Sequence, residues 1–136
     1  DVLDHLELRD GDRVCMVGCF LPLLRRLENR NVEVLAVDER PRAGALPAGE
    51  AAAILPGSQV ALITATSLVN GTLDGLLELA SSCRAVALLG PSTPMLPRAF
   101  AATSIKLLSG ILEDPQCFFI PDPCKGIEPG AVGLAV

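Results

Sequence analysis

Residues 59–72 read QVALITATSLVNGT, and this stretch decides the fold. Its first half, residues 59–65, is an apolar run of the kind found in strands that a parallel sheet buries on both faces. The polar second half leads into a segment whose apolar residues recur at the spacing of one helix face. Those residues are Leu73, Leu76, Leu77 and Ala80. The stretch predicts a buried strand, a polar loop and a helix.

The same order of strand and helix extends along the chain in both directions. Further strands are predicted at residues 13–17, 32–37, 84–89 and 105–112. Short helices are predicted after Pro22, at residues 50–55 and at 94–102, with a loop at 39–49. Strands that alternate with helices imply right-handed crossovers and a parallel sheet. We therefore predict an α/β fold, a Rossmann-like three-layer domain with a mainly parallel sheet.

The sequence predicts one folded unit with a tail. The length of 136 residues suits a single domain, and the strand and helix pattern occupies residues 1–114. Four prolines follow in residues 115–136, where we predict an irregular C-terminal tail. They are Pro115, Pro121, Pro123 and Pro129.

The composition excludes several classes of protein. A net charge of −5 with 3% aromatic residues does not suit nucleic-acid binding. No apolar run is long enough to span a membrane, and the sequence starts without a signal peptide. Five scattered cysteines fit reduced thiols and a cytoplasmic location. With 50% hydrophobic residues and a mean hydropathy of +0.46, we expect a partner domain or subunit to cover some apolar surface.

Ligands of such folds bind beyond the carboxyl ends of the strands. We therefore expect a crevice around Gly18, Asp38, Thr66 and Gly90, each of which follows an apolar run. The loop after Gly18 lacks the further glycines of a dinucleotide-binding loop, which disfavours ordinary NAD binding. Gly18 fits a tight turn and a ligand contact equally well.

Asp38 lies twenty residues after Gly18, at the end of the second predicted strand. An acidic residue at this spacing commonly binds ribose hydroxyls, so a nucleotide, S-adenosylmethionine or another ligand with vicinal hydroxyls would suit it. The alternative is a solvated carboxylate paired with Arg40 or Arg42.

The polar loop that ends at Thr72 has a structural and a binding interpretation. Asn70 or Thr72 is predicted to cap the following helix, and Thr66 and its neighbours could bind an anion at the helix start.

A metal site made by the protein alone is not predicted. The chain has no C-x-x-C pair and only one histidine, His5. Cys15 is expected in the core. Cys19 precedes a helix start, where a thiol pKa falls, although a buried, inert thiol is the favoured interpretation. No pair of nucleophile and base is recognisable.

Four segments together resemble a known family. They are VGCF at 17–20, DERP at 38–41, TATSLVNGT at 64–72 and LGPSTP at 89–94. Over residues 1–114 the chain resembles the Rossmann-like domain of the heavy-metal-chelation family of prokaryotic proteins. Two departures are Cys19, where the family pattern suggests proline, and the proline-rich tail in place of a closing helix.

The resemblance implies a C-terminal α/β domain that follows a smaller N-terminal domain, with a ligand site at their junction. The residues it would place in that site are Gly18, Phe20, Asp38, Arg40, Thr66, Asn70, Thr72, Gly90, Pro91 and Ser92, and Cys19 could add a thiol.

Three functions follow as hypotheses. The first is a small-ligand-binding domain that handles metal through a chelating small molecule. The second is a transferase dependent on S-adenosylmethionine or a nucleotide, and the third is a non-catalytic scaffold or subunit domain, as a partner domain or homo-oligomer would require. The sequence leaves open whether any reaction is catalysed.

Overall fold

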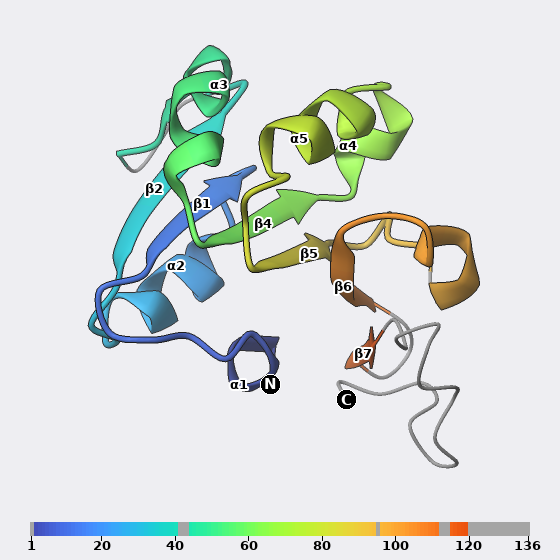
Figure 1. The fold of residues 1–136 in the computed structure, drawn as a ribbon, viewed down its shortest axis with the longest axis horizontal. Helices are drawn as coiled ribbons and strands as arrows, with labels where there is room; N and C mark the ends of the chain where they lie inside the picture. Colours follow the sequence, from blue (N-terminus) through green and yellow to red (C-terminus); the bar gives the residue numbers. More distant parts are fainter. Residues whose placement is uncertain (1, 41–43, 95, 112–114, 120–136) are drawn as a thin grey trace.

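The computed structural model describes residues 2–40, 44–94, 96–111 and 115–119 (Figure 1). These residues form a seven-stranded sheet in the order β3-β2-β1-β4-β5-β6-β7. All neighbouring strands are parallel except β6 and β7, which are antiparallel. The strands are β1 Arg13–Val17, β2 Glu33–Asp38, β3 Leu46–Pro47, β4 Val60–Thr64, β5 Ala85–Leu89, β6 Ile105–Ile111 and β7 Pro115–Phe119. The predicted Rossmann-like α/β fold with a mainly parallel sheet is confirmed.

Helices cover both faces of the sheet, which gives three layers (Figure 1). Residues of α3 and α5 pack into one core cluster, and residues of α1 and α2 pack into the other. The α-helices are α1 Val2–His5, α2 Leu21–Leu27, α3 Ala51–Ile54, α4 Thr66–Val69 and α5 Leu73–Leu79. Short 3-10 helices are η1 Ala48–Glu50, η2 Leu55–Gly57 and η3 Pro97–Phe100. None of the helices in the described ranges has the length and apolar character that crossing a membrane requires.

The central strand β4 explains why residues 59–65 are so apolar. It lies between β1 and β5, and its residues Val60, Ala61, Leu62 and Ile63 are fully buried. Val60 and Leu62 pack into the core cluster under α1 and α2, whereas Ala61 and Ile63 pack into the cluster under α3 and α5. Each face of the strand therefore needs apolar side chains, which removes the alternation seen in half-exposed strands.

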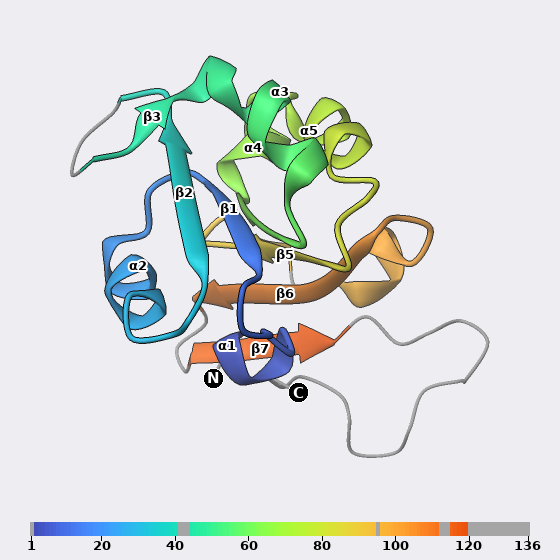
Figure 2. The same cartoon turned by 60° about the vertical axis from the view of Figure 1, so that its left-hand side comes forward.

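Four elements differ from the sequence prediction. In place of the helix predicted at 94–102, the described residues form only the 3-10 helix η3. The predicted loop at 39–49 contains the short strand β3, and α4 occupies part of the predicted loop before α5. The predicted irregular tail is wrong for residues 115–119, which form β7 at the edge of the sheet (Figure 2). Proline is tolerated there because Pro115 is the first residue of an edge strand. The rest of the predicted tail, residues 120–136, lies outside the described residues.

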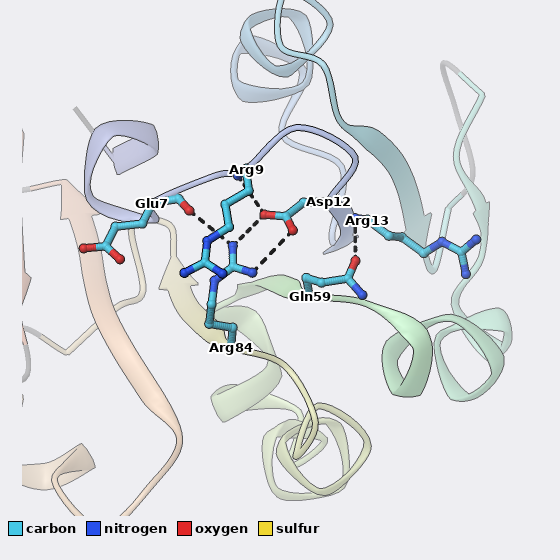
Figure 3. Close-up of polar contacts among 6 residues, drawn as sticks. All are labelled: Glu7, Arg9, Asp12, Arg13, Gln59 and Arg84. Atoms are coloured by element: carbon cyan, nitrogen blue, oxygen red, sulfur yellow. Dashed lines mark hydrogen bonds and ion pairs between the residues drawn. The ribbon is translucent and has the colours of Figure 1, made fainter.

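A polar network joins the N-terminal segment to the amino ends of the strands (Figure 3). The Arg84 guanidinium donates to both carboxylate oxygens of Asp12, at 2.5 and 3.3 Å, and to the carbonyl oxygen of Glu7 at 3.2 Å. The N–H of Arg9 also donates to Asp12 Oδ2. The hydrogen bond from Arg84 is the main reason why the pKa of Asp12 lies below its ordinary value, although burial opposes the shift.

Candidate functional site

A cavity of about 280 Å³ opens where β1, β2 and β4 end. Strand order reverses here, because β1 is followed along the chain by β2 on one side and later by β4 on the other. This switch point is where ligands of open α/β sheets bind. The lining residues are Val17, Gly18, Val37, Asp38, Glu39, Ala48, Thr64, Thr66, Ser67, Asn70, Thr72 and Leu76.

The loop between β1 and α2 forms one wall, and Gly18 lets it lie close to β4. Gly18 has φ +90°, and a Cβ at this position would lie 2.8 Å from Thr64 Cβ. Any side chain would therefore collide with β4 and would also strain the backbone. The tight-turn interpretation of Gly18 is confirmed, and the glycine also lines the cavity.

Asp38, the last residue of β2, holds the backbone of two loops. Its Oδ2 accepts the N–H of Cys19 at 2.9 Å, and its Oδ1 accepts the N–H of Arg40 at 3.0 Å. The described contact with Arg40 is therefore made by the backbone of that residue. Arg42 lies outside the described residues. Asp38 also lines the cavity, as the ribose hypothesis requires, but whether it contacts a ligand stays a prediction.

Hydroxyl groups from the end of β4 and the start of α4 form the opposite wall. Thr64 Oγ1 lies 3.3 Å from Thr66 Oγ1 and also accepts the N–H of Thr66 at 3.4 Å. The Ser67 hydroxyl donates to the carbonyl oxygen of Thr64 at 2.7 Å. Thr64 and Ser67 thus combine a contact within the turn with a position in the cavity wall.

A chain of hydrogen bonds links the end of β2 to the start of α5. Asn70 Nδ2 donates to Glu39 Oε1 at 3.4 Å, and Asn70 Oδ1 accepts the Thr72 hydroxyl at 2.7 Å and its N–H at 3.2 Å. The capping prediction needs a correction for Thr72, which occupies the N-cap position in a helical conformation without a side-chain cap. Asn70 instead accepts the N–H of Thr72, the residue just before the helix, through its amide oxygen.

The structure brings five of the predicted site residues into this cavity. They are Gly18, Asp38, Thr66, Asn70 and Thr72. Cys19 and Phe20 follow Gly18 but are not part of the lining, and Arg40 is exposed beyond the end of β2.

Gly90, Pro91 and Ser92 lie outside the cavity lining, in the loop after β5. The Gly90 N–H donates to the carbonyl oxygen of Ser109, so this loop is attached to β6. A Cβ at Gly90 would lie 3.5 Å from the ring of Phe20, which shows that the two residues are neighbours. The contacts of Gly90 with β6 and Phe20 account for its place in the fold, and a ligand role for this loop stays a prediction.

Sequence reasoning missed several lining residues. Glu39 directly follows Asp38 at a strand end, and this position was a usable signal for a second carboxylate. Ala48 joins the wall because β3 pairs with the end of β2, which no local pattern indicates. The remaining ones are Val17, Val37, Ser67 and Leu76, whereas Thr64 belongs to the polar loop that the sequence already indicated.

The cysteine thiols and the acidic groups of the described residues do not gather into a metal site. Cys15 is fully buried, as predicted, and burial raises the pKa of its thiol to about 12, with Cys83 nearby adding to the shift. Burial also raises the pKa of Cys83. Within residues 2–40, 44–94, 96–111 and 115–119, no three His, Cys, Asp or Glu side chains are grouped to hold a metal ion.

Two solved structures with a similar fold belong to one family. A crystal structure of a DUF364 family protein of unknown function from Desulfitobacterium hafniense is 35% identical, with a TM-score of 0.69, over 74% of this chain and 41% of that chain. A DUF364 structure from Pyrococcus horikoshii has a TM-score of 0.74 and 24% identity over 81% of this chain and 46% of its own. The chain thus spans less than half the length of either protein. No curated protein matches the sequence.

The family model agrees with the structural comparison. The model of DUF364, described as "Putative heavy-metal chelation", matches residues 1–119. This range includes every strand of the described sheet, β7 among them. The chain therefore belongs to the DUF364 family.

Proposed function

We propose that this domain binds a small molecule in the cavity at the carboxyl ends of β1, β2 and β4, and that the molecule carries a heavy metal. The observation that carries the proposal is the meeting of polar side chains from separate strand ends around one 280 Å³ space at the switch point. Small-ligand sites combine an apolar lining with a few converging polar groups, and Val17, Val37 and Leu76 supply the apolar part here.

The chemistry of the lining favours a chelated metal over a bare ion. Heavy transition metals prefer imidazole and thiolate ligands, whereas the described lining offers carboxylate, hydroxyl and amide groups. Such groups suit hydrogen bonds to the organic part of a chelate. The metal would then be held by the chelating molecule, and by residues elsewhere in a longer protein.

We propose further that a partner domain covers the side of the sheet where the carboxyl ends of the parallel strands lie, which we call the carboxyl edge. Large apolar side chains are exposed in this region, with Val69 78% and Leu96 65% exposed. Leu21, Leu46 and Leu68 are exposed at the same edge. The chain corresponds to 41% and 46% of two solved relatives, so in proteins of that length there is enough further sequence to form such a domain. Burying this edge would enclose the cavity and shield its ligand from water.

Metal binding by the full-length protein tests the proposed function. We expect equilibrium dialysis with Ni, Co, Zn and Cu to show binding in the presence of amino-acid or polyaminocarboxylate chelators. Asp38→Asn should weaken that binding by about tenfold, because the loss of one charged contact is worth about 1.4 kcal/mol. Asp74→Asn is the matched control, since Asp74 is exposed on α5 outside the cavity lining. Absence of binding with every metal and chelator would overturn the proposal.

The partner-domain proposal has a separate test. We expect Val69→Asp in the full-length protein to loosen the covered edge, seen as faster limited proteolysis and weaker chelate binding. Asp74→Asn again serves as the control. Unchanged proteolysis and unchanged binding in Val69→Asp would show that nothing covers this edge.

A further inference from the structure

The nature of the ligand follows from which hydrogen-bonding groups the cavity walls leave available, given the proposed small-molecule function. In nucleotide-binding α/β folds, a phosphate lies against free N–H groups in the loop after the first strand. Here three successive N–H groups of that loop are already engaged within the protein. Gly18 donates to the carbonyl oxygen of Val37 at 2.8 Å, Cys19 to Asp38 Oδ2 at 2.9 Å, and Phe20 to Met16 Sδ at 3.4 Å.

The start of α2 offers fewer donors than an ordinary helix start. Pro22 stands in its first turn and has no N–H. The Asp38 carboxylate lies against the same loop through its bond to Cys19, so a phosphate approaching here would meet a negative charge. At the place where other members of this fold class hold phosphate, the engaged N–H groups and the Asp38 charge therefore both disfavour an anion.

The charge of the whole lining points the same way. Asp38 and Glu39 both line the cavity, and no Lys, Arg or His is among its described lining residues. Anion sites in proteins use Arg or Lys side chains or unpaired N–H groups. The described lining provides no Arg or Lys side chain, and its two carboxylates favour a neutral or positively charged ligand.

The hydroxyl groups in the walls mostly offer acceptors. The Ser67 hydroxyl donates to the carbonyl oxygen of Thr64, and the Thr72 hydroxyl donates to Asn70 Oδ1. A hydroxyl has one proton to donate, so these two oxygens can only accept a further hydrogen bond. With the carboxylates of Asp38 and Glu39, the cavity is rich in acceptors. A matching ligand must donate.

We propose that the cavity binds a phosphate-free ligand that presents hydroxyl or ammonium groups to Asp38, Glu39 and the hydroxyls of Ser67 and Thr72. The cavity would bind the phosphorylated counterpart of the same ligand more weakly. The discrimination arises because the N–H groups of the β1–α2 loop already donate hydrogen bonds to Val37, Asp38 and Met16. The inference rests on the proposed small-molecule site and adds the chemical class of its ligand.

Calorimetric titration of the full-length protein with matched compounds tests this class. Adenosine and AMP differ only in the phosphate, so the hydroxyl arm compares them directly, and spermidine provides the ammonium arm. We expect adenosine to bind at least about tenfold more tightly than AMP, or spermidine to bind without competition from millimolar inorganic phosphate. AMP binding as tightly as adenosine, or phosphate competing with spermidine, would overturn the inference.

Variants then show whether the carboxylates cause the discrimination. In the double variant Asp38→Asn, Glu39→Gln, the difference between adenosine and AMP should shrink, and spermidine binding should weaken. Asp74→Asn should behave as the unmodified protein. If metal chelates bind but neither adenosine nor spermidine does, the inferred ligand class is wrong and the proposed function survives. If nothing binds at all, both are wrong.

Discussion

Two aspartates at opposite ends of the strands both accept backbone N–H groups, but their surroundings differ. Asp12 lies where the strands begin, which we call the amino edge, and Asp38 lies at the carboxyl edge. Asp12, before β1, accepts the N–H of Arg9 and is closed off by the guanidinium of Arg84. Asp38, at the end of β2, accepts the N–H groups of Cys19 and Arg40, and the cavity lies beside it. Asp12 is 6% exposed, whereas Asp38 is half-buried.

The two aspartates have different proposed roles, Asp12 in stability and Asp38 in ligand binding. At the amino edge the negative charge is neutralised by a cation from the same chain, so that edge holds the N-terminal segment in place (Figure 3). At the carboxyl edge Asp38 and Glu39 line a cavity, where we propose that a ligand binds beside them.

The largest effect on stability is expected where the carboxyl edge is most tightly packed. Gly18→Ala should lower the free energy of unfolding by about 3 kcal/mol, because it combines a left-handed backbone with a Cβ 2.8 Å from Thr64 Cβ. Gly11 at the amino edge is the matched control. It has φ +83° and no atom within 4 Å of the added Cβ, so Gly11→Ala should cost only about 1 kcal/mol.

Urea unfolding of the two variants measures both costs. The gap between them isolates the contact with Thr64 from the backbone strain that both glycines share. Equal costs would mean that the loop after β1 can move away from β4, and that the wall of the cavity is not rigid.

The glycine comparison also shows what sequence could and could not predict. Strand β4 was predictable because burial on both faces leaves an apolar run that no other element explains. Asp38 and Thr66 were predictable site residues because each follows such a run. Ala48 was not predictable, since it reaches the cavity through pairing of β3 with β2. The close approach of Gly18 to Thr64 was not predictable either, because it depends on how near the loop after β1 lies to β4.

One error has a physical cause of the same kind. The strand β7 was missed because proline was taken to exclude regular structure, although the first position of an edge strand tolerates it. Gly90 also follows a strand, but its N–H donates to Ser109, which attaches its loop to β6 outside the cavity lining, and its ligand role stays a prediction. A position at a strand end therefore does not by itself place a residue in this cavity.

The next effect concerns the ion pair of the amino edge. Arg84→Met should lower the free energy of unfolding by about 2 kcal/mol, because it leaves the buried Asp12 carboxylate without its charged donor. Arg13→Met is the matched control, since the pair of Arg13 with Glu33 has side chains 42% and 54% exposed. We expect it to cost less than about 1 kcal/mol.

Urea unfolding measures these two costs as well. If Arg84→Met were as mild as Arg13→Met, water would be replacing the guanidinium, and the amino edge would not differ in kind from an exposed surface.

Lowering the pH should weaken the Asp12–Arg84 ion pair, with a smaller effect on the free energy of unfolding than Arg84→Met. The folded chain holds the pKa of Asp12 below the ordinary value of 3.8, so the unfolded chain binds this proton more readily. The stabilisation is complete above that value and is lost as the pH falls through the lowered pKa. Stability curves from pH 6 down to pH 2 should therefore fall less steeply in Asp12→Asn than in the unmodified protein. Parallel curves would contradict the assignment of this proton to Asp12.

The smallest stability change is expected at the exposed link across the cavity. Asn70→Ala removes the bonds to Glu39 and Thr72 and should cost about 0.5 to 1 kcal/mol, because the groups it releases are free to bind water. Its effect on binding should be larger, since the Thr72 hydroxyl would no longer donate its proton to Asn70, and both residues line the cavity. The comparison of urea unfolding with calorimetric titration of adenosine, AMP and spermidine separates these two roles.

A freed Thr72 hydroxyl can donate to a phosphate, so Asn70→Ala should narrow the preference for adenosine over AMP, or let phosphate compete with spermidine. If ligand selectivity were unchanged while stability fell, Asn70 would belong with Asp12 among the residues that only hold the fold.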